Sequence, residues 1–270
     1  MRSVRIALIL VALHAEALAQ APLASESARA IEAAKIAVKA AEEYKFSREG
    51  KSSLPLTFEP KPLLQWSNPV VGSIHGTVFV WTDKGRPEVV ASIYKWYGPK
   101  NFHLGVEFHS LSTDPIRAER LGQVAWSPRK PGLAFAPVPD APAVADSAAK
   151  RLRQMRTIAE QFNAVEKDHD GVTRELRRLT QPVYRNPGSD PTHPDGALFT
   201  FVLGTDPEVF LLLEARRHAD GTLGWDYALT RMNSVELRVT HQGREVWSLP
   251  EMPWDVVFGH VEPYTVFMFD

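Results

Sequence analysis

The segment Gly76–Ile93, with the sequence GTVFVWTDKGRPEVVASI, is followed 120 residues later by a diverged copy, GALFTFVLGTDPEVFLLL, at Gly196–Leu213. The two segments align without a gap. In each, runs of bulky apolar residues flank a turn-forming stretch that contains glycine and proline, as in a β-hairpin. A repeat at a fixed distance predicts a tandem duplication of one structural unit. The identical pairs are Gly76/Gly196, Phe79/Phe199, Pro87/Pro207, Glu88/Glu208 and Val89/Val209.

Each copy of the hairpin is preceded by a segment with the apolar spacing of an amphipathic helix. Ser25 is the predicted N-cap of a first helix that runs to about Phe46. Asp146 is the predicted N-cap of a second helix, whose apolar positions continue as far as Val165. One face of each helix is therefore expected to be buried against the strands that follow it.

Further apolar runs predict two more strands after each hairpin. The predicted fold class is therefore α+β, with two repeats of a helix followed by a roughly four-stranded antiparallel sheet, packed together. The first repeat spans residues 20–143 and ends in a proline-rich connector, and the second spans residues 144–270 and adds a strand at Tyr264–Phe269. The expected strands are 77–82, 88–97, 102–111 and 121–126, then 197–203, 208–217, 223–231 and 235–247, the last with a turn at 241–243.

The strand that contains Val209-Phe210-Leu211-Leu212-Leu213 is apolar at every position. A strand with one solvated face alternates apolar and polar residues, so this one is expected to be covered on both sides. The predicted helix of its own repeat supplies one cover. The other repeat is the expected second cover, which would join the two repeats into one body.

The first nineteen residues have the pattern of a secretory signal peptide. Arg2 and Arg5 precede a short apolar run, and Ala17-Leu18-Ala19 supplies the small residues of a cleavage site. The segment Met1–Ala19 therefore predicts export to the periplasm or the cell exterior. No later segment is apolar enough over ~20 residues to predict an integral membrane span.

Composition narrows the classes of function further. The chain has a net charge of −1, without the basic excess that nucleic-acid binding requires. It contains no cysteine, which excludes disulfides, thiolate metal sites and a cysteine nucleophile. The usual dinucleotide, phosphate, zinc-protease and hydrolase motifs are missing from the sequence. We therefore predict no cofactor and no metal.

A group of titratable residues lies on the strand expected at 102–111. Because side chains alternate between the faces of a strand, His103, Glu107 and His109 share one face. Two imidazoles and a carboxylate are suitable for acid-base chemistry or for holding a divalent ion. The outer two lie ~20 Å apart along the strand, so they cannot converge without neighbours. The solvated face of a half-buried strand is the interpretation that this pattern favours.

Aromatic residues form a second candidate site. Tyr94 and Trp96 share a strand face, with Trp81 on the adjacent strand and Trp66 before it. Such a group would line a groove for a sugar or a peptide, although packing in a core explains the same residues and is favoured. The positions 120 residues later are Glu214 and Arg216, so the aromatic patch belongs to the first repeat alone.

The segments Trp66-Ser67-Asn68-Pro69, Gly85-Arg86-Pro87-Glu88-Val89-Val90 and Gly204-Thr205-Asp206-Pro207-Glu208 resemble a family of uncharacterised exported bacterial proteins. That family carries no known activity, so the resemblance assigns no functional residue. The function expected from the sequence is that of an exported, non-catalytic protein that binds an unknown ligand or protein partner. The alternative is a small periplasmic hydrolase or isomerase that uses the His/Glu group.

Overall fold

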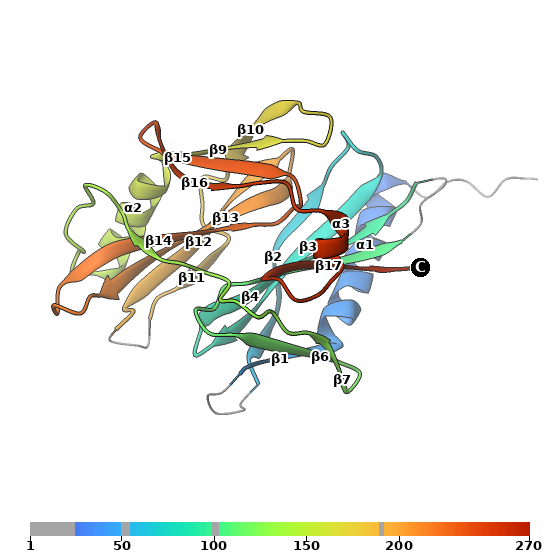
Figure 1. Cartoon of the computed structure of the whole chain (residues 1–270), viewed down its shortest axis with the longest axis horizontal. Coiled ribbons are helices and arrows are strands. Elements are labelled where there is room, and N and C mark those ends of the chain that lie inside the picture. The colour runs from blue at the N-terminus through green and yellow to red at the C-terminus, as the bar shows by residue number, and fades with distance from the viewer. Residues whose placement is uncertain (1–24, 50–54, 99–102, 189–191) are drawn as a thin grey trace, which may run out of the picture.

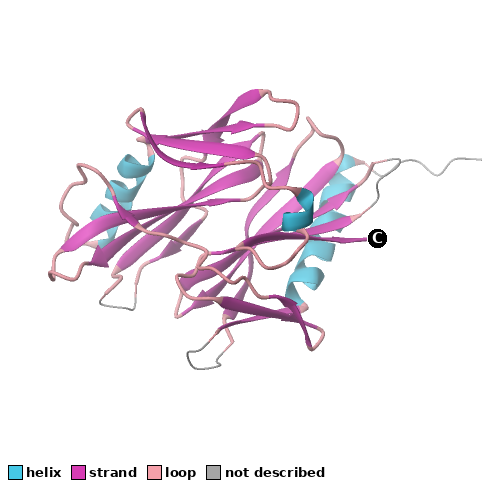
Figure 2. Ribbon diagram, viewed as in Figure 1, coloured by secondary structure: helices cyan, strands magenta, loops and turns pink. Residues whose placement is uncertain are grey.

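The computed structural model describes residues 25–49, 55–98, 103–188 and 192–270. The expected signal peptide, Met1–Ala19, lies outside these residues. The two halves of the chain lie side by side, with one long helix on each outer side and β-sheets between them (Figure 1). Figure 2 shows that strands make up most of the molecule. Among the described residues, no helix is long and apolar enough to cross a membrane.

The first half begins with helix α1, for which Ser25 is the N-cap, as predicted; its side chain accepts a hydrogen bond from the amide of Ala28. The half contains a five-stranded sheet in the order β17-β5-β4-β3-β2 and a three-stranded sheet in the order β1-β6-β7. Its elements are α1 (Glu26–Glu42), β1 (Tyr44–Arg48), β2 (Thr57–Ser67), β3 (Ile74–Asp83), β4 (Arg86–Trp96), β5 (Leu104–Ser110), β6 (Ile116–Arg120) and β7 (Gln123–Trp126).

The second half is built on a nine-stranded sheet in the order β16-β15-β9-β10-β12-β13-β14-β8, with β11 paired to β12. Ser147, and not Asp146, is the N-cap of its helix α2. Its elements are β8 (Ala136–Pro137), α2 (Ala148–Ala159), β9 (Phe162–Lys167), β10 (Thr173–Arg178), β11 (Tyr184–Asn186), β12 (Asp195–Leu203), β13 (Asp206–Arg217), β14 (Leu223–Arg231), β15 (Glu236–His241), β16 (Arg244–Leu249) and α3 (Trp254–Val257). The last strand of the chain, β17 (Tyr264–Phe269), returns to the five-stranded sheet of the first half.

The predicted plan of a helix followed by four strands, used twice, is wrong. The described residues form sheets of three, nine and five strands. Both helices are shorter than predicted because their last apolar residues belong to separate strands, β1 and β9, which pair with the later strands β6 and β15. Short polar strands such as Thr173–Arg178 lack the apolar alternation that marks a strand, so they were missed.

The two hairpins that carry the repeated sequence have the same register. Phe79 pairs with Ala91, and Phe199 pairs with Leu211, each 120 residues later. Both hairpins also have an irregularity at the same place, after Trp81 in β3 and after Phe201 in β12. A bulge at this position increases the local twist of the hairpin. Positions 120 residues apart in these hairpins therefore occupy equivalent places.

A shared apolar core joins the two halves. Phe210 and Leu212 of β13 pack in one cluster with Val78 and Val80 of β3. On the other face of β13, Leu211 and its neighbours pack in a core with residues of α2. This strand is thus covered on both sides, as its uninterrupted apolar sequence predicts. A third core lies between α1 and the five-stranded sheet.

Two glycines let aromatic rings lie flat across the inner face of the five-stranded sheet. A Cβ at Gly76 would lie 2.1 Å from the ring of Trp66, and a Cβ at Gly105 would lie 2.2 Å from the ring of Tyr94. The indole nitrogen of Trp66 crosses over Gly76 and donates to Ser92 Oγ at 3.0 Å. Glycine is required at both positions because of this close approach, although the strand itself would favour a larger residue.

We predict that Gly76→Ala lowers the free energy of unfolding by ~1–3 kcal/mol, because the buried indole of Trp66 must move to make room for the methyl group. Urea denaturation measures the loss. In a Trp66→Leu background the same substitution is expected to cost under ~1 kcal/mol, since the clash is gone. An equal cost in both backgrounds would contradict this account.

Candidate functional site

The two hairpins contact the opposite half through their turns. Thr205 Oγ1, in the β12–β13 turn, accepts a hydrogen bond from the amide of Ser67 at 2.9 Å and donates to its carbonyl at 2.7 Å. In the β3–β4 turn, the carbonyl of Gly85 accepts a bond from the Tyr184 hydroxyl at 2.9 Å. Each turn is followed by two charged residues that face the other half. These residues are Arg86 and Glu88 in the first hairpin and Asp206 and Glu208 in the second.

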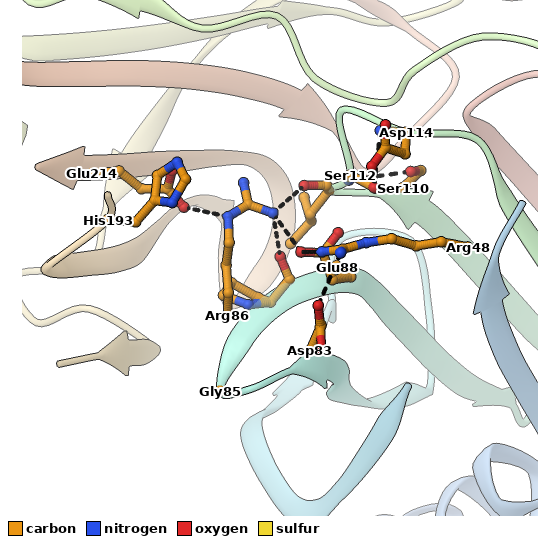
Figure 3. Close-up of polar contacts among 12 residues, drawn as sticks. Arg48, Asp83, Gly85, Arg86, Glu88, Ser110, Ser112, Asp114, His193 and Glu214 are labelled. Carbon is orange, nitrogen blue, oxygen red and sulfur yellow. Dashed lines mark hydrogen bonds and ion pairs between the residues drawn. The ribbon is translucent and has the colours of Figure 1, made fainter. Parts of the chain in front are cut away.

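Beside the first turn, the charges form a continuous chain of ion pairs across the two halves (Figure 3). Arg86 binds Glu88 at 2.7 Å and Glu214 of β13 at 2.8 Å. Arg48 binds the same oxygen of Glu88, Oε1, and Arg216 binds Glu214 at 2.9 Å. Glu88 is fully buried and Glu214 is 2% exposed, and burial of each charge is offset by an arginine. We call this group the arginine chain.

Two arginines of the chain, Arg86 and Arg48, are held in their charged form. Burial disfavours the charged guanidinium of Arg86, but Glu214 and Glu88 outweigh burial and raise its pKa. The same balance, with Glu88 as the main partner, raises the pKa of Arg48. A cavity of about 320 Å³ opens beside the chain. Because carboxylates pair with all three arginines, the chain serves to join the halves.

Arg86→Met is predicted to lower the free energy of unfolding by ~3–5 kcal/mol, because it removes a side chain that pairs with a buried carboxylate from each half. Arg117→Met provides the matched control, since Arg117 pairs with Glu119 at 3.2 Å where both side chains are over 40% exposed. That loss should stay below ~1 kcal/mol. Equal losses in chemical denaturation would refute a structural role for the chain.

Beside the second turn, the equivalent positions carry carboxylates without arginines. Asp206 replaces Arg86, Glu208 replaces Glu88, and Glu166 of β9 lies near them. The amide nitrogen of Asn233 donates to both Glu166 and Glu208, and that of Asn68 donates to Asp206 at 3.3 Å. The nearest arginine, Arg174, contacts Glu166 at 3.7 Å but binds Asp168 at 2.5 Å. These residues line a cavity of about 550 Å³ between the halves, which we call the acidic cavity.

Three carboxylates of the acidic cavity, Asp206, Glu208 and Glu107, hold protons more tightly than ordinary carboxylates do. Burial raises the pKa of Asp206 to about 8, and the charge of Glu166 adds to the shift. Burial, with the charges of Asp206 and Glu166, raises the pKa of Glu208 well above its usual range. Burial and the charge of Asp206 do the same to the pKa of Glu107. The charged forms of these groups are therefore destabilised, because the cavity provides them with little positive charge.

Three of the five residues predicted as site residues lie together in the wall of the acidic cavity: Tyr94, Trp96 and Glu107. Tyr264 of β17 donates a hydrogen bond to Glu107 Oε1 at 3.3 Å. Tyr94 is 8% exposed, and Trp96 is partly exposed. Because the second half covers this face of β5, the prediction of a solvated strand face is wrong. Trp66 and Trp254 complete the aromatic part of the wall.

The two histidines do not join this group. His109 is 5% exposed, and it lines a different cavity, with Tyr264 between the two. Burial lowers the pKa of His109 to about 4, and its Nδ1 lies 2.8 Å from the carbonyl of Ser110. His103 packs its ring against Trp96 with 5.8 Å between the ring centroids. Trp81 lies on the opposite face of its strand, in the core beside α1, and so does not belong to the aromatic patch.

Sequence reasoning missed the carboxylates that the second half contributes. One signal was present: the repeated hairpins have Arg-Pro-Glu at Arg86–Glu88 and Asp-Pro-Glu at Asp206–Glu208, so a charge is reversed between equivalent positions. Glu166 gives no such signal, because the apolar spacing extends the predicted helix into the strand that carries it, β9. The part of the chain that the structure describes contains no group of three or more His, Asp or Glu side chains arranged to hold a metal ion.

No protein-family model, no curated protein and no solved structure matches the chain. The chemistry of the cavities is therefore argued from the chain's own residues.

The raised pKa of Asp206 predicts the pH dependence of stability. Between pH ~4 and pH ~8 the folded protein retains a proton on Asp206 that the unfolded chain has released, so the unfolding free energy falls as the pH rises through this window. Asp206→Asn should remove this contribution, which has a slope of at most ~1.4 kcal/mol per pH unit. Denaturation at a series of pH values measures the slope. Asp255→Asn, in the exposed helix α3, should leave it as in the wild type, and an unchanged slope in Asp206→Asn would contradict the assignment.

Proposed function

We propose that the protein is an exported, non-catalytic binding protein whose acidic cavity takes a small organic cation with N–H donors, such as an alkylammonium group. The observation that supports this most directly is the replacement of Arg86 by Asp206 at equivalent positions. Among the described residues, Asp206 and Glu208 form no ion pair, although Arg174 contacts Glu166 at 3.7 Å, and two such carboxylates are complementary to a positively charged ligand. A volume of about 550 Å³ suits a small molecule.

The polar atoms of the wall favour a ligand that donates hydrogen bonds. The side-chain oxygens of Asn68 and Asn233 are buried and have no hydrogen-bond partner, and Asn68 is 3% exposed. Both amides are oriented by their nitrogen atoms, which donate to carboxylates. The two amides thus add acceptors that have no donor, and a buried acceptor without a partner is costly. An ammonium group supplies three donors together with the charge.

The aromatic side chains of the wall are suited to the same ligand. The rings of Trp66 and Tyr94 lie 5.8 Å apart, and Trp96 lies at the partly exposed side of the cavity. Aromatic faces attract cations, by ~0.5–2 kcal/mol depending on how far the pair is shielded from water. The alkyl part of an amine would also gain apolar contact there.

Export to the periplasm or the cell exterior is part of this proposal. It rests on the pattern of Met1–Ala19 and on the resemblance of segments such as Trp66–Pro69 to uncharacterised exported proteins. An internal repeat centred on the two hairpins belongs to it as well, and their common register supports that repeat.

A small hydrolase is the second candidate, and the raised pKa values of Glu107 and Glu208 favour it, because a general acid must hold its proton near neutral pH. Turnover of a 4-nitrophenyl glycoside that is lost in Glu107→Gln, and kept in Asp255→Asn, would support the enzyme. The absence of turnover across such glycosides would leave the binding protein as the better account.

The main test is titration calorimetry with n-butylammonium, and with 1-butanol as the uncharged probe of similar size. We expect butylammonium to bind more tightly than butanol, and its affinity to rise with pH up to about 8, because the cation displaces the proton that Asp206 holds in the empty cavity. Proton release on binding is measured in buffers of different ionisation enthalpy.

Variants test whether butylammonium binding depends on the carboxylates of the cavity or on the overall charge of the surface. Asp206→Asn and Glu208→Gln should each weaken butylammonium binding by about tenfold, as expected for the loss of a charge-assisted hydrogen bond. Asp255→Asn is the matched control and should bind as the wild type does. Equal affinity for the two probes, or an affinity that falls as the pH rises, would sink the proposal.

A further inference from the structure

A second cavity, of about 710 Å³, lies on the other side of Tyr264 from the acidic cavity. The segment 130–134, the end of β14 and the segment 249–256 line it. Most of its wall is apolar. We call it the apolar cavity; its apolar side chains include Leu133, Leu229, Trp247, Met252 and Val256.

One charged side chain in this wall is buried without a counter-ion. Arg231, at the end of β14, is 2% exposed. One of its terminal nitrogens, Nη2, donates to the carbonyls of Val235 and Pro250, both at 2.8 Å. Its Nε has no partner, and no carboxylate among the described residues forms an ion pair with it. The neighbouring Thr230, 2% exposed, also has a hydroxyl without a partner.

The other charged groups of the wall form ion pairs. Lys130 and Glu262 form an ion pair at 3.2 Å, and Glu251 binds His169 at 2.8 Å. His109 is neutral at ordinary pH, because burial lowers its pKa to about 4. Arg231 therefore stands apart from the other ionisable residues of this wall, and from Arg86, which has two carboxylate partners.

A buried, unpaired guanidinium is costly, and here burial lowers the pKa of Arg231 without a carboxylate to offset it. Arginine is the residue best suited to hold a carboxylate, because its planar group presents donors in a fixed fork. The remaining wall would cover an apolar tail.

We propose that the apolar cavity is a second ligand site, which binds an amphipathic organic carboxylate: the carboxylate pairs with Arg231, and the hydrocarbon chain lies against Leu133, Trp247 and Met252. This site is separate from the acidic cavity and does not depend on a cation binding there. Its ligand has the opposite charge, which follows from the opposite character of the unpaired groups in the two walls.

The test is titration calorimetry at neutral pH with decanoate, and with 1-decanol as the uncharged probe of the same chain length. We expect decanoate to bind at least about tenfold more tightly than decanol, because the alcohol cannot pair with the guanidinium. Arg231→Gln should weaken decanoate binding by about tenfold or more and leave decanol binding unchanged. Arg238→Gln, on the partly exposed strand β15, is the matched control and should bind both probes as the wild type does.

A second variant, which keeps Arg231, tests the site in case Arg231→Gln does not fold. Met252→Trp fills the cavity from a partly exposed segment, and it should reduce binding of both probes while circular dichroism shows the native spectrum. Equal affinity for decanoate and decanol would overturn the proposal, because the arginine would then add nothing. No binding of decanoate by the wild type, or undiminished binding by Met252→Trp, would overturn it as well.

Discussion

The apolar contact between the two large sheets positions every other feature of the molecule. Strands β3 and β4 on one side and β12 and β13 on the other turn their inner faces toward one core, which contains Val80, Val90, Phe210 and Leu212. With a helix on each outer side, the central strands have no solvated face. Any polar group that reaches this region must then find a partner at the margin of the core.

That margin explains why charge is concentrated where the hairpin turns meet the other half. At one side, Arg86 forms ion pairs with carboxylates from both halves. At the other side, Asp206 and Glu208 lie near further carboxylates. Their raised pKa values favour the protonated form, which carries no charge. The regions beside the two hairpin turns thus have the same backbone register but opposite charges at equivalent positions, Arg86 and Asp206. The first region joins the two halves through ion pairs, and the second holds carboxylates with raised pKa values.

The sequence was a good guide wherever a pattern was local or repeated. It located both hairpins, the strand Leu223–Arg231, the turn near Gln242 and the strand Tyr264–Phe269, because each has a dense apolar run or a clear turn composition. It also showed that Val209–Leu213 is covered on both faces. It failed for short strands with mixed polarity, such as β6 and β10, whose existence depends on partners elsewhere in the chain. The sequence predicted part of the acidic cavity, because Tyr94, Trp96 and Glu107 lie on two neighbouring strands of the first half. It did not predict the side chains of the second half, which join this wall only in the folded protein.

Strand β17 has a consequence for the order in which the molecule is assembled. It pairs with β5 along its whole length, and Tyr264 bonds to Glu107 across 157 residues of sequence. Until the chain has been synthesised that far, β5 presents an open edge to its surroundings. The five-stranded sheet of the first half is therefore complete only when the C-terminal strand has joined it. Contacts between such distant residues slow folding. Shielding of the β5 edge by another protein during synthesis would protect the chain in that interval.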